Sequence, residues 1–159
     1  MSKIKFRAFI KSTKEIVDVE WIDFINKQIT YHRIDFKDFG LVSSASFEEI
    51  ELMQYTNLND RNGKEIYEGD IADVYYMDFI KYRAQIIFGE YEQDGSGGEY
   101  STTECMGFYA KALNPDELDS DGIRIIPDYC KETSILALSS IEIIGNIYED
   151  KHLLECDAG

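Results

Sequence analysis

The chain has 159 residues, of which 44% are hydrophobic and 13% aromatic, and this composition excludes a largely disordered protein. Its formal net charge is −15, and the excess acid lies entirely after residue 50: residues 1–50 hold eight basic and eight acidic side chains, whereas residues 51–159 hold 8 and 23. A surface this negative repels phosphate backbones, so direct nucleic-acid binding is not expected.

The lengths of the apolar segments and the number of cysteines indicate in which cell compartment the protein is expected. No stretch approaches the roughly 20 apolar residues that span a bilayer, and the basic N-terminus has no apolar run behind it, so no secretory signal is predicted. Three widely spaced cysteines, Cys105, Cys130 and Cys156, argue against a disulfide framework and for the reducing cytoplasm. Because no CxxC pair is present, we expect no structural zinc. No cofactor is expected either.

Short strands joined by tight turns are predicted for the first third of the chain, because apolar and polar residues alternate with a period near two. The predicted elements are strands at 4–9, 15–19, 21–24 and 28–34, turns at 11–14 and 26–27, and a loop around 38–40. Residues 47–55 fit either a helix or a strand, and the short pattern favours a strand.

The middle of the chain, residues 52–71 (LMQYTNLNDRNGKEIYEGDI), is called the central block below. Asn62-Gly63 predicts a tight turn, since both residues tolerate a positive φ. A second turn is expected at Glu68-Gly69-Asp70, where Gly takes a restricted conformation and Asp accepts hydrogen bonds from free backbone N–H groups. Further predictions are strands at 71–77, 82–88, 106–113 and 141–144, a mobile loop at 91–102, a helical turn from 114 and a short helix at 148–154.

Many short strands separated by Gly, Asn and Asp turns predict a mainly β fold. We expect a small, strongly bent β-barrel at residues 51–159, preceded by an N-terminal β-hairpin region at residues 1–50, with few short helices.

Three segments carry a resemblance to a known family. They are Ile4 to Ala8, most of the central block, and Ile143 to Glu149 (IIGNIYE). In their order and spacing the chain resembles the YopX family of phage and prophage proteins. It departs from the family pattern at Phe9, where Trp is usual, and at Asn57, where Gly is usual, although Asn also tolerates positive φ. Residues 78–140 match little of the family pattern.

The resemblance implies an SH3-like β-barrel, a phage or prophage origin and the bacterial host cytoplasm. It supplies no biochemical activity, because the family is largely uncharacterised and a fold does not decide a function.

Ten polar, aromatic and glycine residues form the candidate binding set: Gln54, Tyr55, Asn62, Gly63, Lys64, Tyr67, Gly69, Asp70, Gly145 and Asn146. They could form a patch that recognises a partner or a small ligand. The alternative is structural, because Gly, Asn and Asp in these positions have clear roles in turns.

No catalytic constellation is recognisable. Only two histidines, His32 and His152, could serve as a base for a nucleophile. In residues 117–128 the acidic residues and a glycine have the spacing of a calcium-binding loop. The first position, however, is Glu117 instead of the usual Asp, and Pro127 precedes the last position, so an acidic surface turn is predicted. The glycines at 95–98 are flanked by acids that would repel a phosphate, and a flexible loop is expected there.

The sequence therefore predicts a non-enzymatic phage or prophage accessory protein that binds a protein partner or self-associates into a homo-oligomer. Two alternatives remain. One is a small-ligand-binding or hydrolytic protein that uses the barrel mouth, and the other is an acidic decoy for a nucleic-acid-binding enzyme.

Overall fold

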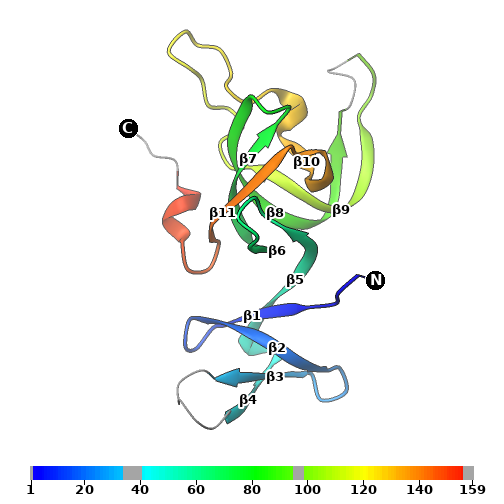
Figure 1. The fold of residues 1–159 in the computed structure, drawn as a ribbon, viewed down its shortest axis with the longest axis vertical. Coiled ribbons are helices and arrows are strands. Elements are labelled where there is room, and N and C mark those ends of the chain that lie inside the picture. Colours follow the sequence, from blue (N-terminus) through cyan, green and yellow to red (C-terminus); the bar gives the residue numbers. More distant parts are fainter. Residues whose placement is uncertain (1, 34–40, 95–98, 156–159) are drawn as a thin grey trace. The chain divides into compact units, whose positions relative to one another are not determined.

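The structure is a computed structural model that describes residues 2–33, 41–94 and 99–155. The chain forms two compact units, residues 1–57 and residues 58–159 (Figure 1). Both are built from antiparallel strands with a few short 3-10 helices, so the prediction of a mainly β fold is confirmed. The expected loops around 38–40 and 95–98 lie outside the described residues.

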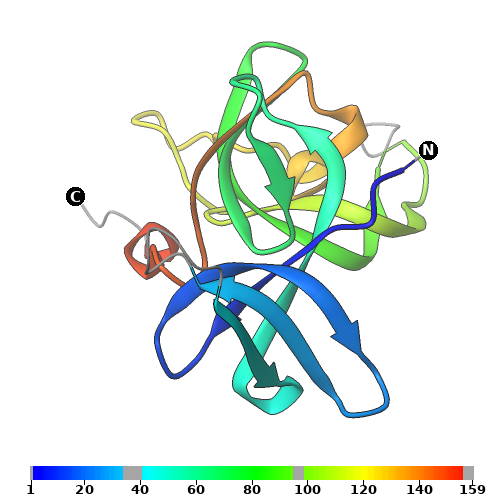
Figure 2. The ribbon, with the colours of Figure 1, turned by 60° about the horizontal axis from the view of Figure 1, so that its bottom comes forward.

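The strands of the first unit pair in the order β4-β3-β2-β1-β5, which is part of a six-stranded antiparallel sheet that ends at β6. Its elements are β1 (Phe6–Ile10), β2 (Glu15–Asp23), β3 (Gln28–Arg33), β4 (Leu41–Ser46), the 3-10 helix η1 (Phe47–Glu49) and β5 (Ile50–Asn59). The β2–β3 hairpin is seen along its length in Figure 2. Alternation along the strands buries one face: Ile29 and Tyr31 of β3 pack with Ala8 and Ile10 of β1.

Residues 47–55, whose sequence fitted either a helix or a strand, form a short 3-10 helix followed by a strand. Phe47–Glu49 form one 3-10 turn, in which the Ser46 N–H donates to the Glu49 carboxylate at 3.0 Å, and Ile50 starts β5. Ser46 and Glu49 thereby form a capping box. The strand prediction holds from Ile50 onward.

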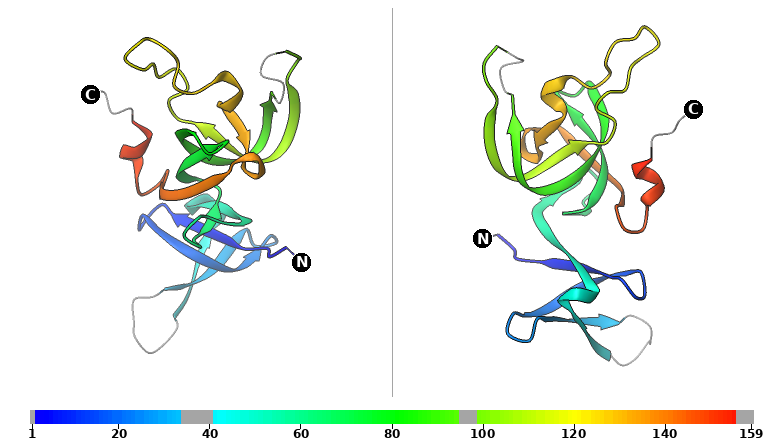
Figure 3. Two further views of the ribbon diagram at one scale, coloured as in Figure 1. Left: turned by 45° about the horizontal axis from the view of Figure 1, so that its top comes forward. Right: turned by 180° about the vertical axis from the view of Figure 1, so that it is seen from behind.

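The second unit has a five-stranded sheet with the order β10-β9-β8-β7-β11. Its strands are β6 (Glu65–Tyr67), β7 (Asp70–Tyr76), β8 (Ile80–Gln93), β9 (Thr103–Ala112), β10 (Glu132–Ser134) and β11 (Ser140–Asn146), and its 3-10 helices are η2 (Asp128–Cys130), η3 (Ile135–Ala137) and η4 (Lys151–Leu154). β8 and β9 form a long, curved ribbon (Figure 3). The core of this unit is centred on Ile66, Val74 and Ile86.

The SH3-like barrel is not confirmed, because no closed barrel is found in the part of the chain that the structure describes. The sheet ends at β10 and β11, which do not pair with each other. β10 has only three residues. The outer edge of β11 is occupied by the turn at residues 61–64, where the Arg61 N–H donates to the Ile141 carbonyl at 2.9 Å. These hydrogen bonds occupy the edge that closure would need.

Asn114 starts a single turn, as predicted, with the Glu117 N–H 3.3 Å from the Asn114 carbonyl. Two local expectations differ from the structure. The last helix is shorter than predicted, a 3-10 turn at Lys151–Leu154. The expected loop at 91–102 is partly strand, because β8 continues to Gln93. Among the described residues, no helix is long and apolar enough to cross a membrane.

Candidate functional site

Asp60 organises the first turn of the central block. Its side chain is buried, and its carboxylate accepts hydrogen bonds from three backbone N–H groups: Asn62 at 2.8 Å, Lys64 at 2.9 Å and Ile143 at 3.0 Å. Gly63 has a φ of +83°, which the turn requires and which glycine adopts without strain. Asp60 therefore joins the turn at 61–64 to β11, two segments more than 75 residues apart in sequence.

The second turn of the central block meets the C-terminal family segment. Asp70 is 1% exposed and accepts a hydrogen bond from the Tyr67 N–H at 2.8 Å, while Gly69 takes a φ of +83°. Asp70 pairs with Asn146 in the β7–β11 ladder, and the Ile147 N–H donates to the Gly69 carbonyl at 2.9 Å. The structure thus brings Tyr67, Gly69, Asp70, Gly145 and Asn146 together.

Asn146 and Gly145 shape the turn that follows β11. The Asn146 side-chain oxygen accepts hydrogen bonds from the N–H groups of Tyr148 and Glu149, at 3.0 and 2.9 Å. The Asp150 carboxylate accepts the Asn146 N–H at 3.0 Å. A Cβ at Gly145 would lie 2.6 Å from that carboxylate oxygen, so any side chain there would displace it. These polar groups hold backbone in place rather than face a ligand.

The remaining candidates lie elsewhere. Gln54 and Tyr55 belong to β5 in the first unit, where the Lys5 ammonium lies 5.6 Å from the centre of the Tyr55 ring. Asn62 and Lys64 are exposed on the turn that Asp60 holds. A recognition role for the ten residues stays a prediction, and the contacts described above give most of them a structural role.

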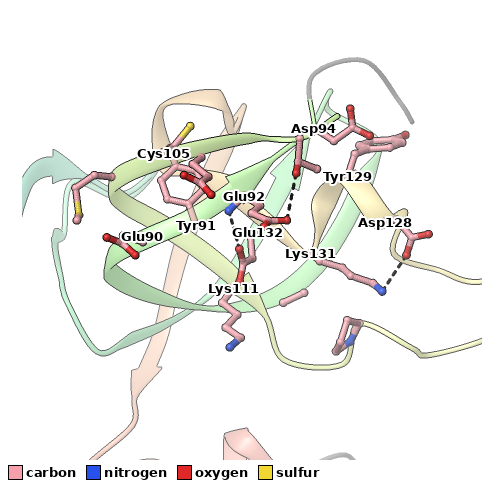
Figure 4. A pocket seen from close by; sticks show the side chains of 15 residues that line it. Glu90, Tyr91, Glu92, Asp94, Cys105, Lys111, Asp128, Tyr129, Lys131 and Glu132 are labelled. Carbon is pink, nitrogen blue, oxygen red and sulfur yellow. Dashed lines mark hydrogen bonds and ion pairs between the residues drawn. The ribbon is translucent and has the colours of Figure 1, made fainter. Parts of the chain in front are cut away.

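A groove of about 820 Å³ lies in the second unit, between the β8–β9 ribbon and the segment that contains η2 and β10 (Figure 4). Its charged lining consists of six carboxylates and two lysines: Glu90, Glu92, Asp94, Glu104, Asp128, Glu132, Lys111 and Lys131. Tyr91 and Tyr129 add aromatic surface. The groove therefore combines a negative lining with two phenol rings.

The carboxylates at the β8 side of the groove are held by neighbouring groups. The Glu132 carboxylate accepts the Glu92 backbone N–H at 3.0 Å, and the Thr102 hydroxyl donates to the Glu92 carboxylate at 3.2 Å. Tyr91 stacks on Tyr109 with ring centres 4.8 Å apart. Burial, followed by the nearby Glu132 carboxylate, raises the pKa of the Tyr109 phenol. Both effects favour the neutral phenol.

Cations neutralise the opposite end of the groove. Lys131 lies 2.9 Å from the Asp128 carboxylate (Figure 4). Arg124 also pairs with this carboxylate. The hydrogen bond from Lys131, opposed by partial burial and reinforced by Arg124, lowers the pKa of Asp128. The unpaired excess of negative charge therefore lies toward the β8–β9 ribbon, where Glu90 and Glu104 are exposed.

The groove was not predicted from the sequence. Its lining falls within residues 78–140, where no motif of known spacing was recognised in the sequence. A usable signal was present in the acids of residues 90–104, but their convergence depends on the β8–β9 pairing, with Glu92 opposite Glu104.

The calcium-like segment forms a hairpin instead of a metal loop. Leu118 bridges to Arg124, and the Asp119 carboxylate accepts the N–H groups of Asp121 and Ile123 at 2.9 and 2.8 Å. Asp119 thus holds its own turn, as the predicted acidic surface turn requires. Within the described residues, no three His, Cys, Asp or Glu side chains are placed to hold a metal ion.

The two described cysteines, Cys105 and Cys130, are both free thiols. Cys105 lines the groove, whereas Cys130 is fully buried. Burial raises the pKa of the Cys130 thiol to about 11.

We expect Cys130 to resist alkylation in the folded protein. At pH 8 a pKa of about 11 leaves roughly one thiol in a thousand as the reactive thiolate, and the burial blocks access as well. Mass spectrometry after timed iodoacetamide treatment should find Cys105 modified long before Cys130, with equal rates in denaturant. Equal rates in the native protein would contradict the buried position.

The fold and the site define a class of protein: an all-β protein of two antiparallel units, in which buried Asp and Asn side chains fix the turns. The YopX protein family model matches residues 5–155, and the chain belongs to this family. Among solved structures it is similar to protein EF1440 from Enterococcus faecalis, with 24% identity, a TM-score of 0.51, and coverage of 98% of this chain and 100% of that one. This likeness shows the fold. A search among curated proteins gave no match.

Proposed function

We propose that the protein is a non-enzymatic binding module whose second unit receives a positively charged segment of a protein partner in the acidic groove. The observation that carries this proposal is the lining of six carboxylates against two lysines. The unit around it, residues 58–159, holds eight basic and 22 acidic side chains, a formal charge of −14. Such a field attracts a basic partner and speeds its association.

The tyrosines of the groove fit the same partner class. Tyr91 and Tyr129 present ring surface beside the carboxylates. Arginine and lysine side chains bind aromatic faces as well as carboxylates, so one basic side chain can use both. The competing hydrolytic function has less support, because the described lining includes Cys105 but no histidine to activate it.

The family resemblance supports a setting for this activity. We infer a phage or prophage accessory protein that acts in the bacterial host cytoplasm, with a strongly bent, SH3-like but open sheet as the frame of the groove. An acidic decoy that occupies the nucleic-acid site of an enzyme is a special case of the same basic partner.

The test uses a fluorescent oligo-lysine peptide as the probe and anisotropy as the readout. The double variant Glu90→Lys/Glu104→Lys should bind about tenfold more weakly at low salt, which corresponds to about 1.4 kcal/mol. The matched control, with the same change in net charge, is Glu117→Lys/Asp121→Lys, which alters two exposed acids on the 117–125 hairpin outside the groove lining. Binding should also weaken with added salt.

The outcomes are separable. Equal losses in the groove variant and in Glu117→Lys/Asp121→Lys would mean that general charge, not the groove, binds the probe. Affinity that does not change with salt, or no binding by the native protein, would refute the proposal.

A further inference from the structure

Strand β4 is a sheet edge that shows none of the usual protective features. It is six residues long, Leu41–Ser46, and lies at the end of the first unit's strand order. Its sequence, LVSSAS, contains no charge and no proline, and its pairing with β3 shows no bulge. Leu41 and Val42 are 57% and 53% exposed. Natural edges normally carry at least one feature that prevents further strand pairing.

The other sheet edges show those protective features. At the opposite end of the six-stranded sheet, β6 has only three residues and starts with Glu65. β10 is only three residues long and starts with Glu132. β11 has an irregularity between Ile143 and Gly145, and its outer edge is bonded to the Asp60 carboxylate and the Arg61 N–H. Compared with these edges, β4 is therefore open to pairing with a further strand.

The hydrogen-bond register identifies which backbone groups of β4 point outward. The Phe47 N–H donates to the Lys27 carbonyl at 2.9 Å. Because bonded and non-bonded pairs alternate in an antiparallel ladder, Ser43 bonds to Tyr31 of β3, whereas the polar groups of Val42 and Ser44 point away from β3. Among the described residues, no backbone group bonds to this outward row.

The charge of the first unit indicates which kind of strand can pair with this edge. The first unit holds eight basic and nine acidic side chains, a formal charge of −1, and the strand itself is neutral. A neutral edge does not attract the positively charged partner proposed for the groove. Two copies of this edge also do not repel each other, because neither carries charge. Its apolar and small residues at 41–46 suit a symmetric contact.

We propose that β4 pairs antiparallel with β4 of a second copy of this chain, around a two-fold axis at Ser43. In this register Val42 lies opposite Ser44 of the second copy, so their outward N–H and C=O groups pair with each other. Leu41 then lies opposite Ala45 on the face that carries the core of the unit. A continuous sheet runs through both copies, and all of the outward groups at 42 and 44 are bonded.

The experiment is sedimentation equilibrium of the full chain over a concentration series. The native protein should show twice the chain mass of 18.4 kDa. Val42→Lys/Ser44→Lys should raise the dimer dissociation constant at least tenfold, because it sets four positive charges on one seam. Both side chains leave the buried core untouched, so circular dichroism should be unchanged.

Two further variants separate the alternatives. Ser44→Pro removes an outward N–H without breaking a bond to β3, and it should also weaken the dimer. Trp21→Lys changes an exposed residue of β2, away from the edge, and should leave the mass unchanged. A monomeric native protein, or a dimer broken by Trp21→Lys and kept by the β4 variants, would overturn the proposal. Neither result bears on binding at the groove.

Discussion

Replacing Ile86 with alanine should lower the free energy of unfolding of the second unit by about 3 kcal/mol. Ile86 is fully buried at the centre of that unit's core, where it packs among side chains of β7, β8 and β9. The change removes three buried carbons and leaves a cavity that a rigid sheet fills poorly. Urea unfolding followed by circular dichroism measures the loss. The matched control is Leu136→Ala, which shortens an 80% exposed side chain in the same unit and should cost under about 0.5 kcal/mol.

The same substitution in the other core shows whether the two units are stabilised separately. Ile29 is also fully buried, but in the core of the first unit. Ile29→Ala should speed hydrogen exchange of amides in β1 to β4, and Ile86→Ala should speed exchange in β7 to β9. If either variant raised exchange equally in both units, a single cooperative core would describe the chain better.

The turns of this fold could be predicted from sequence because their chemistry is local. Asn62-Gly63 and Gly69-Asp70 carry residues that accept positive φ or cap free N–H groups, and the structure places turns at both. The same holds for the strands on either side, whose period-two patterns need no knowledge of distant partners. A 3-10 turn such as Phe47–Glu49 is too short to leave a periodic pattern of its own.

What could not be predicted depends on pairing over long distances. The contacts of Asp60 and Arg61 with β11, which occupy an edge that closure would need, join residues 83 and 80 positions apart in sequence. The groove likewise exists only because β8 and β9 bring Glu92 opposite Glu104 and because β10 returns beside them. Acidic residues give no periodic signal for such a site, since most of them serve as ordinary surface charge.

Asp60→Ala is expected to destabilise the second unit by about 3 kcal/mol, a large effect for a single polar residue. The change removes the acceptor of three backbone N–H groups at once. Water can reach the N–H groups of Asn62 and Lys64, whose residues are exposed, but that of Ile143 lies within the sheet and loses its partner. Asn62→Ala, which changes only an exposed side chain of the same turn, should cost less than about 0.5 kcal/mol. Comparable losses in both variants would assign the effect to the turn rather than to the carboxylate.

The pH dependence gives an independent check on the same carboxylate. Burial raises the pKa of Asp60, but the hydrogen bonds from Ile143, Lys64 and Asn62, together with the Lys64 charge, outweigh it and hold the pKa below its ordinary value of 3.8. A folded-state pKa below the unfolded one stabilises the protein above about pH 4, and this contribution is lost as the pH falls through the folded-state pKa. Asp60→Asn, which cannot ionise, should therefore be less stable than the native protein at pH 7, and the difference should shrink toward pH 2. A difference that stayed constant down to pH 2 would mean that the negative charge of Asp60 does not hold the turn against β11.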